Sequence, residues 1–132
     1  MVRVLRTTDY SDLDLDFLKH PTTKDVVKKT SDDAVKRSIR NLVLTNYYDR
    51  PFRSYIGSNV YKLLFENATS LTAKFVEDAI INVIESFEPR AVVQNVTARL
   101  NNDDNGFDVS ITFTTENSVE PLTTFIFLER IR

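Results

Sequence analysis

The sequence contains no cysteine, one histidine and only two glycines in its 132 residues. Without cysteine the chain can form no disulfide, no thiolate nucleophile and no cysteine-ligated metal site. His20 alone cannot build a histidine-rich metal centre, and because Pro21 follows it we interpret it as a turn residue rather than a catalytic base. Two glycines, Gly57 and Gly106, cannot supply a glycine-rich phosphate loop. We therefore expect no cofactor and no small-molecule substrate.

Long apolar runs and an excess of positive charge are missing too. No stretch approaches the roughly 18 apolar residues of a membrane span, and Met1–Tyr10 lacks the apolar centre of a signal peptide, so we expect no membrane partner. The net charge of −2 lacks the basic excess of a dedicated nucleic-acid-binding protein, so we expect no nucleic-acid partner. Nine phenylalanines, five tyrosines and an apolar content of 42% are typical of one globular domain, residues 1–132.

Charge is unevenly placed along the chain. The segment 34–53 carries five basic residues and one acidic residue, whereas 101–120 carries five acidic residues and no basic one. Such segregation is typical of solvated faces, or of a domain that docks in one orientation between charged partners. The sequence leaves both interpretations open. The five basic residues are Lys36, Arg37, Arg40, Arg50 and Arg53.

The segment Ser11–Leu18 alternates apolar residues with serine or aspartate, which predicts a half-buried strand. The spacing of its three aspartates is that of a calcium loop. An EF-hand, however, needs glycine at its sixth position and glutamate at its twelfth, where this chain has Phe17 and Thr23. We therefore expect no metal site. A turn and a short return strand at Val26–Val27 would complete an N-terminal hairpin.

The middle of the chain predicts three helices. Ser31 is the expected N-cap of the first helix, whose apolar residues recur every three or four positions and which should end near Asn46. A loop over 47–57 follows, and Ser58 is the expected cap of a short second helix. The apolar positions of the second helix are Val60, Leu63, Leu64 and Phe65.

The third helix carries the widest apolar stripe in the sequence. Ser70 or Thr72 is its expected N-cap. Pro89 should end it, because proline disfavours helical geometry at the preceding residue and has no amide hydrogen to donate. The apolar positions of this helix are Leu71, Phe75, Val76, Ala79, Ile80, Val83, Ile84 and Phe87.

After Arg90 the apolar period changes to two residues, which predicts strands. The expected strands are Val92–Leu100, Phe107–Thr114 and Leu122–Ile131, joined by connectors at 101–106 and 116–121. The last strand is apolar on both faces, since Phe125 and Phe127 alternate with Ile126 and Leu128. Such a strand is either central and covered or presents one face to a partner, and the pattern leaves open which strand forms an edge. The expected fold class is α+β, a single domain with a short N-terminal β-hairpin, three helices and a C-terminal three-stranded sheet.

Several short motifs stand in a fixed order on these predicted elements. They are Arg50-Pro51-Phe52, Gly57, Leu64-Phe65-Glu66-Asn67, Leu71-Thr72 and Glu88-Pro89-Arg90. In this order and spacing the chain from Leu13 onward resembles the baseplate wedge family of contractile-tailed bacteriophages of the T-even type, also called lysozyme-like, with a counterpart in type VI secretion baseplates. One position departs from the family, whose members carry a glycine where this chain has Tyr48. Tyrosine would be strained there if a helix cap required a positive φ.

The resemblance implies a structural role in the tail baseplate of a virion that is assembled in the host cytoplasm. Glu88, Pro89 and Arg90 would dock on the core bundle of other wedge proteins. The C-terminal sheet would resemble part of the tail sheath protein and accept extended arms of sheath subunits by strand addition, as a platform for sheath polymerisation. The strand residues expected to take part are Leu122, Thr124, Phe125, Ile126, Phe127 and Leu128. The other matched positions expected to be structural are Arg50, Pro51, Phe52, Gly57, Phe65 and Glu66.

From the residues alone, the Glu88-Pro89-Arg90 tripeptide has two interpretations. It is either an ordinary helix stop followed by a surface arginine, or a rigid bend whose carboxylate and guanidinium pair with each other or bind a partner.

Two further functions compete with the structural role. A glycosidase needs two carboxylates about 5–9.5 Å apart, one of them with a raised pKa. Glu66 and Glu88 are the best candidates, because each follows a phenylalanine. The nearby Arg90 should lower the pKa of Glu88, which is the wrong direction for a general acid, so we expect no catalytic residue and no enzymatic activity. A protein-binding adaptor is the other alternative, although sheath-like strands would be superfluous in it.

Overall fold

The computed structural model describes residues 11–13, 21–22, 24, 28–116 and 118–130. The predicted strand residues beyond Leu13 and the predicted return strand at 26–27 lie outside these residues. Within them, β1 (Ser11–Leu13) pairs antiparallel with β2 (Lys28–Thr30). The predicted pairing of two short N-terminal strands is therefore confirmed, but the second strand is Lys28–Thr30, later than predicted, and it leads directly into the first helix.

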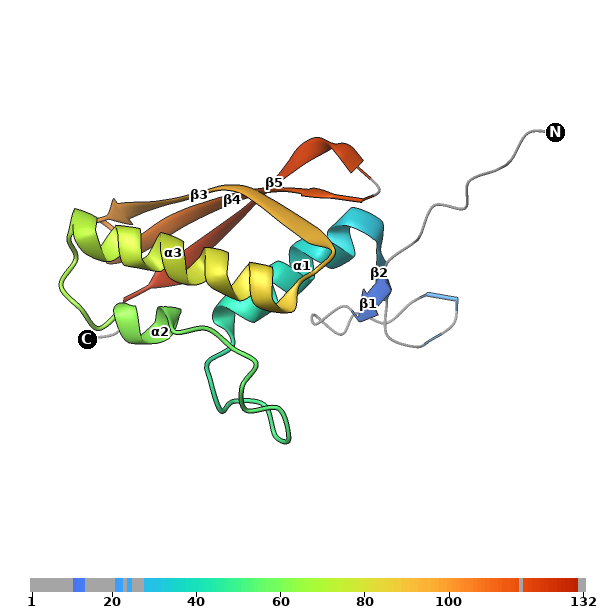
Figure 1. Cartoon of the computed structure of the whole chain (residues 1–132), viewed down its shortest axis with the longest axis horizontal. Coiled ribbons are helices and arrows are strands. Elements are labelled where there is room, and N and C mark those ends of the chain that lie inside the picture. The colour runs from blue at the N-terminus through green and yellow to red at the C-terminus, as the bar shows by residue number, and fades with distance from the viewer. Residues whose placement is uncertain (1–10, 14–20, 23, 25–27, 117, 131–132) are drawn as a thin grey trace.

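Three helices and then three longer strands complete the chain (Figure 1). The helices are α1 (Ser31–Leu44), α2 (Val60–Leu63) and α3 (Ser70–Phe87). The strands are β3 (Ala91–Asn101), β4 (Gly106–Thr115) and β5 (Ser118–Glu129), and they form an antiparallel sheet in the order β3-β4-β5. The predicted α+β class and element order are confirmed. Among the described residues, no helix combines the length and apolarity needed to cross a membrane.

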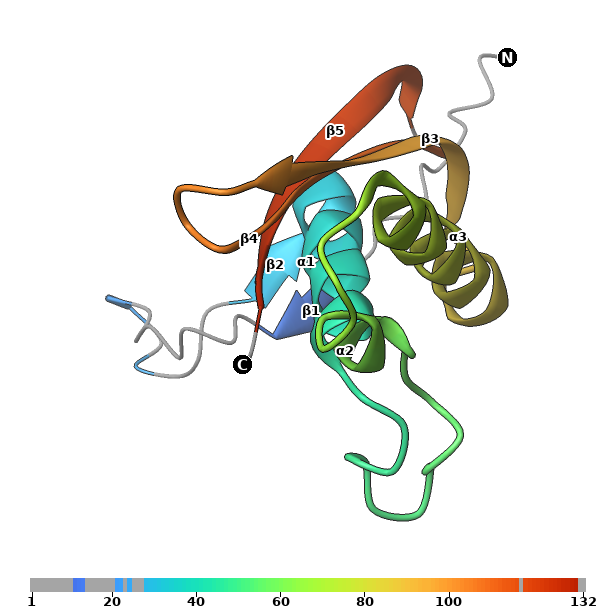
Figure 2. The same cartoon turned by 90° about the vertical axis from the view of Figure 1, so that its left-hand side faces the viewer.

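The two long helices lie on the same face of the sheet (Figure 2). Helix α3 packs along β3, and α1 approaches β5. The alternation of β4 accounts for this layering, because Phe107, Val109, Ile111 and Phe113 are fully or almost fully buried while Asp108 between them is exposed. The core is therefore the layer between the helices and the inner face of the sheet.

The predicted helix caps were wrong. Ser31 is the first residue of α1 and not the capping residue before it. Ser58 does not cap α2: its hydroxyl donates to the carbonyl of Val43 (2.8 Å), and Asn59 occupies the N-cap without a side-chain bond. Helix α3 begins one residue earlier than the pattern suggested. Thr69 is its N-cap, and the hydroxyl of Thr69 accepts the amide of Thr72 (3.2 Å). The first helix also ends earlier, at Leu44 rather than near Asn46.

The apolar stripe of α3 is wider than the surface that covers it. Val76 and Ile80 are completely buried, but Leu71 and Phe75 are 63% and 50% exposed. The helix contacts the sheet along one side only, so one flank of the predicted stripe is left on the surface. Phe75 on that flank is one of the lining residues of a groove along α3.

The last strand starts earlier than predicted. β5 (Ser118–Glu129) includes part of the segment 116–121 that was predicted to be a connector. Pro121 therefore lies inside a strand. Its missing amide hydrogen is tolerated for two reasons: β5 is an edge strand, and the pairing with β4 shifts register between Phe113 and Thr115. Regular pairing runs from Leu122, opposite Phe113, to Glu129, opposite Gly106.

Candidate docking sites

The Glu88-Pro89-Arg90 tripeptide forms the corner between α3 and β3. The amide of Glu88 donates to the carbonyl of Ile84 (2.9 Å) and so closes the last turn of the helix. The amide of Ala91 then donates to the carbonyl of Glu88 (3.2 Å), so that a tight turn holds Pro89 and Arg90. Because Pro89 has a fixed φ and is exposed, the corner is both rigid and accessible.

The side chains of this corner pair with each other. Arg90 binds Glu88 through two parallel hydrogen bonds, Nε to Oε1 (2.6 Å) and Nη2 to Oε2 (2.8 Å). The hydroxyl of Ser38, on α1, donates to Oε2 of the same carboxylate. Glu88 is only 2% exposed, whereas the side chain of Arg90 is 24% exposed. Of the two sequence interpretations, the structure favours the rigid, preorganised bend over an ordinary helix stop.

These contacts set the ionisation of Glu88. Burial alone would raise its pKa, but the hydrogen bonds from Arg90 and Ser38, together with the charge of Arg90, outweigh burial and hold the pKa below its ordinary value. Glu88 is therefore an ionised anchor that fixes the direction of Arg90. Ser38 was missed by sequence reasoning, because nothing local in a chain links two residues 50 positions apart.

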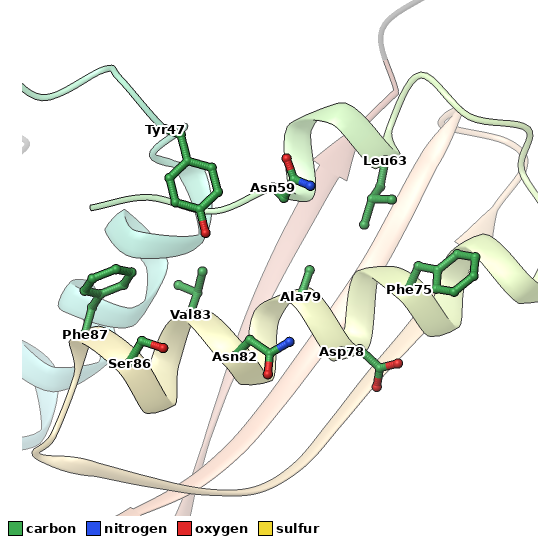
Figure 3. Close-up of a pocket in the computed structure, with 10 residues that line it drawn as sticks. All are labelled: Tyr47, Asn59, Leu63, Phe75, Asp78, Ala79, Asn82, Val83, Ser86 and Phe87. Carbon is green, nitrogen blue, oxygen red and sulfur yellow. The ribbon is translucent and has the colours of Figure 1, made fainter. Parts of the chain in front are cut away.

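A groove of about 390 Å³ runs along α3 toward this corner (Figure 3). Two parallel rows of α3 line it at four-residue spacing. The apolar row is Phe75, Ala79, Val83 and Phe87, and the polar row is Asp78, Asn82 and Ser86. Tyr47, Asn59 and Leu63 line the opposite wall. The corner follows directly after Phe87 in the chain, although Glu88, Pro89 and Arg90 are not among the lining residues.

The loop between α1 and α2 is closed at its base and exposed at its tip. The amide of Ser58 donates to the carbonyl of Thr45 (2.8 Å), and a Cβ at Gly57 would lie 2.6 Å from the backbone of Asn46. Only glycine fits that approach. At the tip, Arg50, Pro51 and Phe52 are all exposed, and they contribute nothing to the core.

Tyr48 has a φ of 72°, which confirms that this position requires the left-handed region. It lies four residues beyond Leu44, so the strain is in the loop and not, as the helix-cap argument supposed, in the cap of α1. The exposed ring of Phe65 packs edge-to-face on Tyr61 at 5.7 Å. Glu66 is exposed as well, and its carbonyl accepts a hydrogen bond from Arg130 Nη2 (3.0 Å).

The strand order leaves both β3 and β5 at an edge, but the two edges differ. On β3, the register shifts between Val93 and Asn95, and Glu77 of α3 accepts the amide of Ala98 (2.9 Å). A bulge and a covering carboxylate are two of the devices that prevent further pairing. In the described part of the chain, no strand pairs with the outer side of β5. β5 is therefore the edge better suited to strand addition.

The prediction that Phe125 and Phe127 lie on one face of β5 and Ile126 and Leu128 on the other is confirmed, and the structure shows which face is buried. Ile126 and Leu128 are 2% and 3% exposed, whereas Phe125 is 74% and Phe127 is 44% exposed. Leu122 and Thr124 are half-buried on the inner side. The two outer aromatics are not equivalent, because a Cβ at Gly106 would lie 2.5 Å from the Phe127 ring. Phe127 thus covers a glycine of the neighbouring strand, and Phe125 has the more exposed ring.

The carboxylates of the glycosidase alternative lie at opposite ends of α3. Glu66 precedes this helix and Glu88 follows it, and an 18-residue helix is about 27 Å long. Glycoside hydrolysis needs its two carboxylates within about 10 Å. Among the described residues, no three acidic or histidine side chains gather into a metal-binding group. Two aspartates of the calcium alternative, at positions 14 and 16, lie outside those residues.

The fold is similar to those of a putative tail lysozyme and of chains from two baseplates. A putative tail lysozyme from Geobacter sulfurreducens superposes with a TM-score of 0.67 at 20% identity, over 78% of this chain and 96% of that one. A chain of the anti-feeding prophage baseplate superposes with a TM-score of 0.64 at 18% identity, over 94% of this chain and 88% of that one. A chain of the postcontracted pyocin R2 baseplate superposes with a TM-score of 0.55 at 14% identity, over 89% of this chain and 98% of that one. At these identities the similarity shows the fold alone.

Sequence comparison is more specific. The chain is 36% identical to baseplate wedge protein gp25 of Enterobacteria phage T4 over 81 residues, which are 61% of this chain and 61% of the length of that relative. The family model described as baseplate wedge protein gp25 matches residues 29–118, more than half of the chain. This matched region contains all three helices, the corner and the strands β3 and β4. The chain therefore belongs to the baseplate wedge protein gp25 family.

Proposed function

We propose that this protein is a structural, non-enzymatic component of a contractile-tail baseplate wedge. It docks on a helical core of other wedge proteins through its corner and groove, and it offers the β5 edge to the tail sheath protein as a platform for sheath polymerisation. It acts in the virion baseplate after assembly in the host cytoplasm. The observation that carries the proposal is the doubly hydrogen-bonded Glu88–Arg90 pair, which follows directly after Phe87, a lining residue of the open groove.

The groove is suited to a helix. From Phe75 to Phe87 it follows about 18 Å of α3, which matches roughly three turns of a partner helix. Residues four apart on α3 form ridges that pack against the ridges of another helix. The polar row of α3 is placed to hydrogen-bond the rim of that interface. Arg90 lies where the partner helix would leave the groove and can bind a carboxylate or a carbonyl there.

A charged side chain inside the groove tests the docking role without touching the core. Asn82→Arg places a guanidinium among the groove residues, whereas Glu85, which is also exposed on α3, lies outside them, so Glu85→Arg is the control. Each variant is co-expressed with the other wedge proteins, and the purified wedge is assayed for this chain. We expect Asn82→Arg to be lost from wedges and Glu85→Arg to be retained. Retention of both would contradict docking through the groove.

The platform role rests on the β5 edge and its outer aromatic. An added strand would satisfy edge amides and carbonyls and cover the ring of Phe125. Phe125→Ser should therefore reduce sheath nucleation on purified baseplates. Val92→Ser is the matched control, because Val92 is 65% exposed on the other edge strand. Equal nucleation by wild type and Phe125→Ser, counted by electron microscopy, would count against the platform role.

A further inference from the structure

The open edge of β5 is unusually free of charge. The run Leu122–Leu128 contains no charged residue, and it is bounded by Pro121 at one end and Glu129 at the other. Natural edge strands commonly carry charges or proline that discourage pairing. Here such residues stand only at the ends of the run. They delimit a segment of seven residues on which one added strand would fit.

Basic side chains of α1 border this edge on its inner side. A polar cleft of about 280 Å³ lies between the helix and the strand, and Thr124 is its residue on β5. Its other lining residues come from successive turns of α1: Asp33, Lys36, Arg37 and Arg40. Lys36 is half-buried and Arg40 is exposed. Three bases against one acid give the inner side of the edge a positive charge.

The two sides of an added strand would therefore meet different chemistry. Side chains alternate between faces, so every second residue would stand beside Thr124 and extend toward Lys36 and Arg40. The residues between them would stand on the outer face, beside the ring of Phe125, which is 74% exposed. Aromatic rings pair favourably with β-branched or aromatic residues across strands.

We propose that the β5 edge selects an extended partner segment whose side chains alternate between carboxylates and apolar residues. The carboxylates face α1 and pair with Lys36 and Arg40, and the apolar residues cover Phe125. The proposal rests on the proposed function and gives it a chemical specificity: the partner segment is acidic on one face. The backbone of β5 can hydrogen-bond any added strand, and the basic side chains of α1 favour acidic strands over basic ones.

Short peptides test the selection directly. One seven-residue peptide alternates glutamate with valine, and its counterpart has lysine in place of each glutamate. Each is titrated into the full-length isotope-labelled protein, and binding is followed by NMR through the backbone amides of Leu122–Glu129. We expect the glutamate peptide to bind roughly fivefold or more tightly than the lysine peptide, with the difference shrinking in high salt.

Two charge variants assign the preference to α1. Lys36→Gln combined with Arg40→Gln should remove the difference between the peptides. Lys62→Gln combined with Lys74→Gln, two exposed lysines on α2 and α3 that do not line the cleft, should preserve it. Equal binding of both peptides along β5 would overturn the charge selection and leave strand addition standing. If neither peptide shifts the β5 amides, strand addition at this edge is contradicted, and the selection with it.

Discussion

Replacing Arg90 with alanine should destabilise the protein by about 2–3 kcal/mol. The substitution removes two hydrogen bonds from a carboxylate that is 2% exposed. Removing one partner of a buried ion pair costs about 3–5 kcal/mol. Two features reduce the cost here: the Arg90 side chain is 24% exposed, so water can reach the carboxylate, and Ser38 continues to donate to Oε2.

Urea unfolding followed by circular dichroism measures this loss. With a slope of about 1.5–2 kcal/mol per molar urea, the midpoint should fall by about 1–2 M. Arg99→Ala, an exposed arginine on β3, is the control and should cost less than about 1 kcal/mol. Adding Glu88→Gln to Arg90→Ala should recover part of the loss, because the unpaired buried charge is then gone. A midpoint for Arg90→Ala equal to that of wild type would refute the reasoning.

Acidification, two backbone positions and the enzymatic alternative give further tests. The pKa of Glu88 in the folded protein is lowered from 4.5, so its ionised carboxylate stabilises the fold fully above that pH, and this stabilisation is lost as the pH falls through the folded-state pKa. The difference in unfolding free energy between wild type and Glu88→Gln should therefore shrink in acid, and a difference that persisted in strong acid would oppose this. Gly106→Ala should cost about 1–3 kcal/mol and lower the melting temperature, since its Cβ would meet the Phe127 ring and the Leu128 carbonyl at 2.5 and 2.6 Å. Tyr48→Gly should raise the free energy of unfolding, measured in urea titrations, by about 0.5–1 kcal/mol, because glycine adopts a φ of 72° without strain. A lower free energy of unfolding in this variant would mean that the tyrosine ring has a role in the fold. Purified protein should leave peptidoglycan intact; lysis that disappears in a Glu66→Gln, Glu88→Gln double variant would establish a glycosidase.

Features with a short-range physical cause could be predicted from the sequence. The period of two in the C-terminal third predicts that Phe125 and Phe127 share one face and that Ile126 and Leu128 share the other, as the structure confirms. Which of the two faces is buried depends on where the helices pack, and the period does not show that. Pro89 ends α3 because of its own ring and missing amide hydrogen, and the helix accordingly ends at Phe87. A guanidinium two residues from a carboxylate predicts a lowered pKa, and that of Glu88 is lowered.

Features that depend on tertiary contacts could not be predicted. The third group on the Glu88 carboxylate comes from Ser38 on another helix, and Glu77 covers the β3 edge from across a helix–sheet interface. Neither pairing has a local signature. The cap of α3 was misplaced because Ser70, Thr72 and the true cap Thr69 all have hydroxyl groups suited to the position, so that only the backbone geometry decides.

A cryo-electron microscopy reconstruction of the assembled baseplate that contains this chain would test the central claim most directly. The measurement is which atoms of neighbouring proteins lie within contact distance of Arg90 and of the β5 backbone. The account predicts a partner helix in the α3 groove against Arg90, and a partner strand hydrogen-bonded along Leu122–Glu129. Solvent at both surfaces, with the neighbours bound elsewhere, would contradict it.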